Sequence, residues 1–292
     1  MHLIQPKSHE LIPDFFVVGH PKCGTTALYK MLGAHPQIFM PVKEPRFFSP
    51  DVKPRTRSLQ EYLDLFAGVA PGQVIGEADP HSLTSRVAPS AIAAHNPAAR
   101  IIALFREPAS FLQSLHLQQL RSHPETVKDL RSAIDLYIDY THYAEQLHRY
   151  RAALPENQIL VVIYDDFRQD NPGTLRQVLD FLGVESTCFL PTIESNSSFA
   201  YRRPLANTML LHLLKGEHPA FSPLQHVLKT VIPRPARQAA IKGFKRRIAR
   251  PSPPHCDEAL AAELRRRFKP EVVQLGDLLG RDLATLWGYD NA

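Results

Sequence analysis

A lysine, a glycine and two threonines follow the first apolar run of the chain, and their order suits phosphate binding. The run from Phe15 to Val18 predicts a strand, and the pattern from Ala27 to Leu32 predicts an amphipathic helix. The first N–H groups of a helix have no internal partner and lie at the positive end of its dipole, so they attract an anion. We therefore expect a nucleotide phosphate to bind at the connecting loop, at Lys22, Cys23, Gly24, Thr25 and Thr26.

This loop differs from other phosphate-binding loops in two ways. Gly19 and Gly24 are spaced like the two glycines of a Walker A loop. However, Thr25 occupies the position of the Walker lysine, and the lysine lies inside the turn as Lys22. Cys23 suggests a phosphatase loop, but no arginine closes the loop after the cysteine, so we interpret this thiol as a small filler. An ordinary strand-to-helix turn is the remaining alternative.

The length and composition are those of a globular α/β protein. A chain of 292 residues, of which 44% are hydrophobic, can bury a full core. We expect a single domain over residues 1–292. Its nucleotide-binding core would span residues 14–184, and residues 185–292 would form a helical extension of the same domain.

Charge and cysteine usage exclude several classes. A net charge of +5 suits anionic ligands but is too small for a nucleic-acid-binding protein. The three cysteines are far apart and have no metal-ligand spacing, so we expect neither a disulfide framework nor a metal site. No apolar run is long enough to cross a bilayer and no N-terminal signal region is evident, so we expect no transmembrane segment and a cytoplasmic location.

The order of apolar runs predicts alternating strands and helices. Strands are expected near residues 74–76, 100–106 and 158–164, and helices near 59–66, 87–94, 130–154 and 172–182. This alternation implies a parallel sheet with helices on both faces. The fold class is therefore α/β, with the phosphate loop after the first strand and a mainly helical C-terminal part.

An arginine at the end of a predicted strand marks a second candidate site. Arg106 follows the strand near residues 100–106, and Ser114 comes eight residues later on the next helix. Ligands of open α/β sheets bind outside the carboxyl ends of strands, so Arg106 and Lys22 could face one crevice. Arg106 would then bind a second phosphate of the same nucleotide. The alternative is an ion pair of Arg106 with Glu107 or Asp166.

Several short motifs occur along the chain in a fixed order. They are Pro21–Thr26, Lys43–Phe48, Arg106 and Pro108 with Ser114, Tyr164–Phe167, Phe181–Gly183, and Leu278–Leu283 with Trp287. Taken together, they resemble the sulfotransferases that use 3′-phosphoadenosine 5′-phosphosulfate, in particular their heparan-type and bacterial members. The similarity runs from about Phe15 to Val184, and the pattern near the end of the chain also looks familial.

The resemblance implies in-line transfer of a sulfuryl group from this co-substrate to an acceptor hydroxyl, with a general base. A lysine and helix N–H groups can stabilise the departing phosphate, so no metal is required; we interpret Asp165 and Asp166 as a turn and cap. The resemblance also implies that the 5′-phosphosulfate is held by Lys22, Gly24, Thr25 and Thr26, and the 3′-phosphate by Arg106 and Ser114. Arg203 would approach the 3′-phosphate, Tyr164 would lie near the adenine, and Phe199 would belong to a segment that closes over it.

Two residues are candidates for the general base. Glu44 lies in a Lys-Glu-Pro-x-Phe-Phe pattern, which in the family carries a catalytic glutamate; the alternative is a surface ion pair with Lys43 and Arg46. His81 is the second candidate, because an imidazole titrates near neutral pH. Ala78 stands where the heparan-type pattern has a lysine, so the acceptor remains open between a small molecule, a carbohydrate, a lipid and a carrier-bound alcohol.

Two other functions share parts of this pattern. A P-loop kinase would transfer phosphate from ATP with Mg²⁺, and a noncatalytic module would bind the nucleotide only. The basic stretch 242–250 could contact an acidic acceptor, a carrier protein or an anionic membrane, but we favour a solvated helix face. The motifs do not specify an oligomeric state.

Overall fold

The computed structural model describes residues 11–52, 58–122, 129–186, 199–201, 249–251 and 258–290. The chain divides into two compact units, of which the first contains Met1–Leu115, Leu130–Asn196 and Asp257–Ala292. The second unit contains His116–Asp129 and Ser197–Cys256. Its described part includes an antiparallel pair of strands, β6 (Phe199–Tyr201) and β7 (Ala249–Pro251). A single domain over residues 1–292 stays a prediction.

The first unit is built on a parallel sheet of five strands in the order β2-β3-β1-β4-β5. The strands are largely apolar and mostly buried, as expected where both faces of a parallel sheet are covered. The predicted parallel α/β sheet is thereby confirmed. The strands are β1 (Phe15–Gly19), β2 (Ile38–Phe39), β3 (Val74–Ala78), β4 (Arg100–Phe105) and β5 (Ile159–Ile163).

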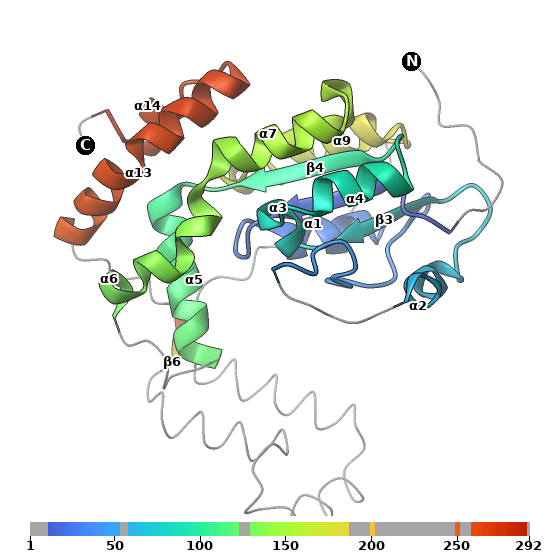
Figure 1. Ribbon diagram of the computed structural model, residues 1–292, viewed down its shortest axis with the longest axis horizontal. Helices are drawn as coiled ribbons and strands as arrows, with labels where there is room; N and C mark the ends of the chain where they lie inside the picture. Colours follow the sequence, from blue (N-terminus) through green and yellow to red (C-terminus); the bar gives the residue numbers. More distant parts are fainter. Residues whose placement is uncertain are drawn as a thin grey trace, which may run out of the picture. The chain divides into compact units, whose positions relative to one another are not determined.

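Helices flank this sheet. Figure 1 shows α4 and α7 in front of β4 and α9 behind it, and α1 packs on β1 and β3. The α-helices are α1 (Thr25–Leu32), α2 (Leu59–Leu63), α3 (His81–Thr84), α4 (Ala88–His95), α5 (Pro108–Ser122), α6 (Leu130–Ala133), α7 (Tyr143–Ala153), α8 (Tyr164–Gln169), α9 (Asn171–Leu182), α13 (Glu258–Leu279) and α14 (Leu283–Trp287). Short 3-10 turns are η1 (Asp64–Phe66), η2 (Ile134–Thr141) and η3 (Glu156–Gln158).

The single helix predicted over residues 130–154 is wrong. The segment forms α6, η2 and α7, and the chain leaves the helical conformation at His142, with φ −76° and ψ 63°. The Thr141 hydroxyl donates to the carbonyl of Ile138 (2.6 Å), and the Gln146 amide donates to the carbonyl of Asp139 (2.7 Å). These side chains occupy carbonyls that a continuous helix would use, which hydrophobic periodicity cannot reveal.

The long helix α13 carries one buried stripe. Leu260, Leu264, Phe268 and Val272 recur at helical spacing and are each less than 10% exposed. The helix contacts α7 and α14. This stripe fixes the C-terminal helices of the first unit to the helical layer beside the sheet.

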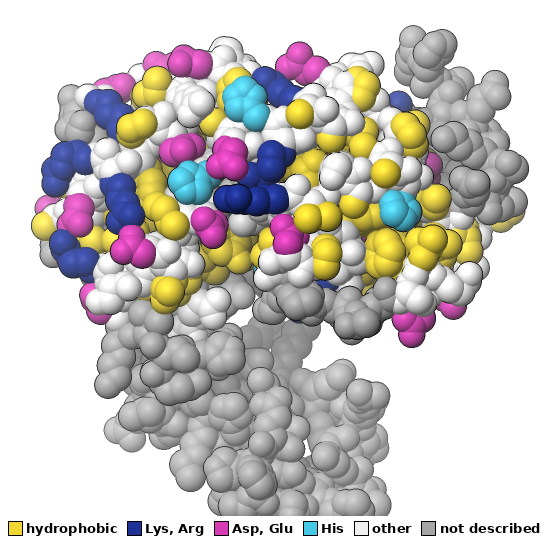
Figure 2. Space-filling model, viewed as in Figure 1, with side chains coloured by type: hydrophobic (Ala, Val, Ile, Leu, Met, Phe, Trp, Pro, Cys, Tyr) yellow, Lys and Arg dark blue, Asp and Glu magenta, His cyan; other side chains and the backbone are white. Residues whose placement is uncertain are grey.

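Charges of both signs alternate over the face that Figure 2 shows. There, the Lys and Arg side chains of the described residues are interspersed with Asp and Glu side chains, so no broad basic stripe forms on this face. Among the described residues, no helix combines the length and the apolar character needed to cross a membrane.

Replacing Gly76 by alanine should destabilise the sheet. Gly76 lies opposite Phe15 in the β1–β3 register, and a Cβ at Gly76 would lie 2.1 Å from Cζ of the Phe15 ring. The fully buried ring would have to move, so we expect Gly76→Ala to lower the free energy of unfolding by about 1–3 kcal/mol. Urea denaturation measures this change.

Gly33→Ala is the matched control, because Gly33 has φ −68° and its nearest atom would be the Tyr29 carbonyl at 3.2 Å. We expect that substitution to change the free energy of unfolding by about 1 kcal/mol or less. Equal stability of the Gly76→Ala variant and the wild type would contradict the packing of Phe15 over Gly76.

Candidate active site

The predicted phosphate loop connects β1 to α1 and ends at a glycine with a positive φ. Gly24 caps α1 with φ 94°, and a Cβ there would lie 3.1 Å from Phe167 and 3.3 Å from Tyr164. A positive φ with so little space favours glycine. No side chain caps α1, and its first turn contains no acidic residue. The start of α1 therefore has the character of a helix end that binds an anion.

Arg106 reaches this loop from the end of β4. Its Nη1 donates to the carbonyl of Lys22 (3.0 Å) and its Nε donates to Oγ of Ser110 (2.8 Å). The guanidinium carbon lies 4.7 Å from the centroid of the Tyr164 ring, a cation–π arrangement. The structure thus brings Arg106, the loop at Lys22 and Tyr164 together, and a shared ligand crevice for Arg106 and Lys22 stays a prediction.

Glu107 and Asp166, which the sequence suggested as ion-pair partners of Arg106, have other partners in the structure. Glu107 accepts hydrogen bonds from the N–H groups of Ala109 (2.9 Å) and Ser110 (2.6 Å) at the start of α5. Asp166 forms an ion pair with Arg281. The alternative in which Arg106 serves as the ion-pair partner of these carboxylates is therefore not favoured.

Two serines on α5 extend the Arg106 site. Ser114 is 2% exposed, and its Oγ has no hydrogen-bond partner within the described part of the chain. Ser110, which accepts from Arg106, lies one helical turn earlier and hence on the same face. A buried hydroxyl without a partner is costly, and a phosphate oxygen would remove that cost. Sequence reasoning missed Ser110, although its spacing of four residues from Ser114 was visible.

Cys23 is a filler of the loop and not a reactive thiol. Its side chain is fully buried, and burial raises the pKa of the thiol to about 12. The thiol therefore stays protonated at neutral pH, whereas a nucleophilic cysteine must be a thiolate. Its N–H donates to the carbonyl of His20 (3.2 Å), which closes the turn.

His20 anchors the loop in the core as a neutral side chain. Burial lowers the pKa of its imidazole to about 3, and its Nε2 donates to Oε1 of Gln146 (2.7 Å). The ring stacks on Tyr143 with centroids 4.9 Å apart, and the Tyr143 hydroxyl donates to the carbonyl of Arg106 (2.7 Å). These contacts connect the ends of β1 and β4.

Backbone strain coincides with the candidate site. Within the described ranges, the non-glycine residues with positive φ are Lys22 (73°), Glu44 (59°) and Arg46 (58°). This region is unfavourable for residues with a Cβ, and such strain tends to gather at functional sites. Lys22 and Glu44 are two of the predicted catalytic residues, and Arg46 adjoins Glu44.

Two phenylalanines anchor the segment that carries Glu44. Phe48 is buried and packs edge-on against Phe16, with ring centroids 5.5 Å apart. Phe47 stacks on Tyr62 with centroids 4.3 Å apart. The Glu44 N–H then donates to the carbonyl of Ala78 (2.8 Å) at the end of β3. This bond places Glu44 beside the residues that follow β3, among them His81.

Glu44 is an ionised carboxylate with basic neighbours. Burial acts to raise its pKa, but hydrogen bonds and charges from Lys43 and Arg46, together with His81, outweigh burial and lower it. The side chain is 32% exposed, and its Oε2 lies 3.3 Å from Nη2 of Arg46. The ion pairs considered at the sequence level are present, and they coexist with the nearby imidazole of His81.

Two buried acidic residues support this region, and sequence reasoning missed both as structural partners. Glu77 is 1% exposed on β3 and accepts a hydrogen bond from the Tyr62 hydroxyl. Asp79 is 2% exposed and accepts from the Ser49 hydroxyl (3.0 Å) and from the His81 N–H (3.0 Å). The sequence did contain a signal for them, because both are acidic residues at the end of an apolar strand. Asp79 fixes the start of α3 and thereby the backbone position of His81.

The interpretation of Asp165 and Asp166 as a turn and cap is wrong. Both lie in the first turn of α8, where Asp165 accepts from Nε1 of Trp287 (3.0 Å) and Asp166 pairs with Arg281. The cap of α9 is instead Asp170, which accepts from the Gly173 N–H (2.8 Å). The first turn of α8 therefore contacts the C-terminal segment, at Trp287 and Arg281.

Some predicted residues cannot be placed at the site. The backbone of Phe199 lies in β6 of the second unit, and Arg203 lies outside the described residues. Residues 242–248 of the basic stretch are also outside them, whereas Ala249 and Arg250 lie in β7 and not in the predicted helix. Among the described side chains, no group of three or more His, Cys, Asp or Glu could hold a metal ion.

Comparison with known proteins identifies a shared domain. Residues 12–217 match the sequence profile of the sulfotransferase domain, more than half of the chain. A mouse protein named heparan sulfate glucosamine 3-O-sulfotransferase 3A1 is 30% identical over 195 residues, which are 63% of this chain and 49% of that protein. Mouse heparan sulfate glucosamine 3-O-sulfotransferase 3B1 is 31% identical over 186 residues, 60% of this chain and 47% of that protein. The chain spans about half the length of the curated relatives it matches.

A solved structure shares the fold over nearly the whole chain. The crystal structure of a sulfotransferase from Alicyclobacillus acidocaldarius matches with a TM-score of 0.66 and 23% identity. The match covers 94% of this chain and 98% of that chain. This similarity shows that the two chains share a fold.

Glu77 should make stability depend on pH. Burial raises its pKa from 4.5 to about 8, against the effect of the Tyr62 hydrogen bond. As the pH rises from 4.5 to about 8, the unfolded chain loses the proton while the folded protein keeps it, so the free energy of unfolding falls. The Glu77→Gln variant keeps an acceptor for Tyr62 but does not titrate. We therefore expect it to gain stability relative to the wild type across this range, measured by urea denaturation.

All other titrating groups are common to the two proteins, so their difference isolates Glu77. Asp135→Asn removes an exposed carboxylate instead and is the control, for which we expect no comparable gain. Parallel curves for the wild type and Glu77→Gln would contradict a protonated Glu77.

Proposed function

Because the chain belongs to the sulfotransferase domain family, we propose that it transfers a sulfuryl group from 3′-phosphoadenosine 5′-phosphosulfate to a hydroxyl group of an acceptor. The observation that carries this proposal is the hydrogen bond from Arg106 to the carbonyl of Lys22 (3.0 Å). It holds two anion-binding groups next to each other at the carboxyl ends of β1 and β4, where a doubly phosphorylated nucleotide would fit.

Each end of the nucleotide has its own binding group in this proposal. The N-terminus of α1 and the Lys22 side chain hold the 5′-phosphosulfate, with Thr25 and Thr26 in the first turn. Arg106 and Ser114 hold the 3′-phosphate, supported by the buried hydroxyl of Ser114. Tyr164, stacked under the Arg106 guanidinium, lies near the adenine. Cys23 contributes its backbone and its small size.

The chemistry needs stabilisation of a leaving phosphate and removal of one proton. The acceptor oxygen forms a bond to sulfur while the bond from sulfur to the 5′-phosphate oxygen breaks, and that oxygen takes the negative charge. In this proposal, the N–H groups at the start of α1 and the Lys22 side chain stabilise this charge. The acceptor proton passes to a general base.

Glu44 is the base that we propose first, and His81 is the second candidate. The lowered pKa of Glu44 keeps its carboxylate ionised at neutral pH, and the positive φ holds it in a fixed orientation at the end of β3. His81 lies close enough to influence the Glu44 pKa, so both groups border the same region. The basic neighbours Lys43 and Arg46 restrain the carboxylate.

The acceptor is proposed as a hydroxyl of a carbohydrate, a small molecule, a lipid or a carrier-bound alcohol. The names of the two mouse relatives refer to glucosamine of heparan sulfate. In this chain the buried Ala78 stands where the heparan-type pattern has a lysine, so this chain departs from the pattern of a polysaccharide-type acceptor site. The cytoplasmic location expected from the sequence stays a prediction.

Ligand-induced stabilisation separates this proposal from the kinase alternative. Adenosine 3′,5′-bisphosphate without metal, at a concentration of about 100 times its Kd, should raise Tm by roughly 5–10 °C. Arg106→Ala should lose most of this shift, because it removes one of the two anion-binding groups. Differential scanning fluorimetry measures both effects. A larger shift with ATP and Mg²⁺ than with the bisphosphate would favour a kinase.

Substitution of the candidate bases tests the catalytic step. With labelled co-substrate and a panel of hydroxyl acceptors, Glu44→Gln should lower kcat by about 100-fold or more because the proton acceptor is lost. His81→Ala should have a smaller effect, and binding of adenosine 3′,5′-bisphosphate should be unchanged in Glu44→Gln. The reverse order of effects would make His81 the base. Full turnover in both variants would contradict both assignments, and nucleotide binding without turnover in the wild type would indicate a noncatalytic module.

A further inference from the structure

The end of the chain contacts carboxylates that border the proposed nucleotide site, and this inference rests on the proposed function. We propose that Arg281, Trp287 and Tyr289, named here the C-terminal clasp, are positioning residues for the donor nucleotide. They bind three carboxylates beside the phosphate loop, which are Asp166, Asp165 and Glu107. The clasp neutralises or fixes these carboxylates so that an anionic nucleotide can bind next to them.

Arg281 supplies the charged contact. Its Nη1 and Nη2 donate to the two oxygens of Asp166, with the Nη2 bond at 2.8 Å, which is a bidentate pair. The side chains are 38% and 43% exposed, so the pair contributes little to global stability. In this proposal, the pair matters because Arg281 neutralises the negative charge of Asp166 near the ligand.

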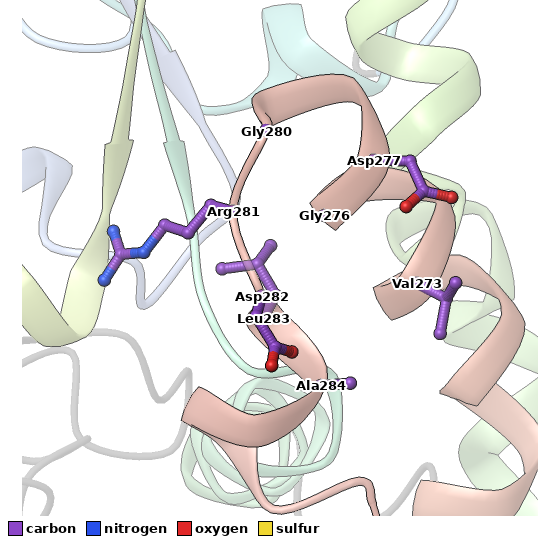
Figure 3. Close-up of a pocket in the computed structure, with 8 residues that line it drawn as sticks. All are labelled: Val273, Gly276, Asp277, Gly280, Arg281, Asp282, Leu283 and Ala284. Atoms are coloured by element: carbon purple, nitrogen blue, oxygen red, sulfur yellow. The ribbon is translucent and has the colours of Figure 1, made fainter.

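The end of α13 determines where Arg281 points. Gly280 has φ 61° and its N–H donates to the carbonyl of Asp277 (3.3 Å), while the Arg281 N–H donates to that of Gly276 (2.9 Å). This is the Schellman arrangement of a helix end. Figure 3 shows Arg281 on the connection between α13 and α14, with its guanidinium pointing away from α13. The cavity of about 430 Å³ in the same view, lined by Val273 and Asp282 among others, is not part of the proposal.

Trp287 and Tyr289 make the other two contacts from buried positions. The Trp287 indole, 6% exposed, donates to Oδ2 of Asp165 (3.0 Å). The Tyr289 hydroxyl, on a fully buried side chain, donates to Oε1 of Glu107 (2.5 Å). Glu107 also accepts from the first N–H groups of α5. The clasp therefore contacts the start of α8 and the start of α5.

These two helix starts carry or support the proposed nucleotide ligands. On α8, Tyr164 and Phe167 flank the two aspartates and are the side chains that a Cβ at Gly24 would meet, at 3.3 and 3.1 Å. On α5, Ser110 accepts from Arg106, which in turn donates to the loop carbonyl of Lys22. A displacement of either helix start would move these groups.

Electrostatics gives the clasp a measurable effect. Adenosine 3′,5′-bisphosphate carries several negative charges, and an uncompensated carboxylate near it would repel the ligand. The charge of Asp165 reaches the loop, since it adds to the effect of burial in raising the pKa of the Cys23 thiol. Asp166 is its sequence neighbour on α8. Removing Arg281 therefore leaves a net negative charge at the border of the site.

Binding of adenosine 3′,5′-bisphosphate, measured by isothermal titration calorimetry, tests the proposal. Arg281→Ala should weaken binding about tenfold at low salt, and the loss should shrink at high salt because the repulsion is screened. Arg281→Lys keeps the charge and should bind within about threefold of the wild type. In turnover assays, Arg281→Ala should raise KM for the co-substrate and leave kcat nearly unchanged.

Two further variants separate charge from structure. Asp166→Asn should bind at least as tightly as the wild type, and Asp166→Asn combined with Arg281→Ala should recover most of the lost affinity. Arg267→Ala is the matched control, because Arg267 lies on α13 and pairs with the exposed Asp135 (2.8 Å). It should bind as the wild type does. Melting temperatures without ligand show whether each variant is folded.

The possible results point to different conclusions. Failure of the wild type to bind the bisphosphate would overturn the proposed function itself. Binding by the wild type with unchanged affinity in Arg281→Ala would overturn the clasp alone. An equally weak double variant would also overturn the clasp, because the loss would then not come from the charge of Asp166.

Discussion

The hydrogen bond between the Arg106 guanidinium and the carbonyl of Lys22 connects the two halves of the proposed nucleotide site. It joins the end of β4 to the loop after β1, and these strands are neighbours in the sheet. A guanidinium that donates to the backbone of an anion-binding loop is held in place before any ligand arrives, so less ordering is required on binding. The Tyr143 hydroxyl adds a second connection at the Arg106 carbonyl.

The proposed site combines backbone strain with side chains held by contacts to the core. Lys22 and Glu44 have positive φ, which persists only where the surrounding contacts hold it. His20 is buried and neutral on one side of the phosphate loop, while Phe47 and Phe48 are packed under the Glu44 segment. In each case an aromatic contact within the core fixes a polar group at its edge.

The C-terminal segment contacts the starts of α8 and α5, which lie far from it in the sequence. Arg281 lies more than 100 residues after Asp166, yet a helix end with a glycine in the left-handed conformation presents it to that carboxylate. Family membership accounts for the sheet and loop, whereas the clasp gives the last helices a proposed part in nucleotide binding. The acidic first turn of α8 contacts the clasp, and Tyr164 and Phe167 of the same helix lie beside Gly24 of the phosphate loop.

Short-range pattern in the sequence was enough for β1, β3, β4 and β5, for the turn at Gly24 and for Arg106 at a strand end, because apolar periodicity and glycine conformations act locally. The two-residue strand β2 was not predicted, since so short a run has no recognisable period. The break at His142 and the use of Asp166 were mispredicted, since both depend on partners far away or on side-chain competition for carbonyls. The protonation of Glu77 likewise follows from burial, which no residue type encodes. The sequence by itself thus determined which residues could bind phosphate, and only the tertiary structure decided which of them meet, because those contacts join segments distant along the chain.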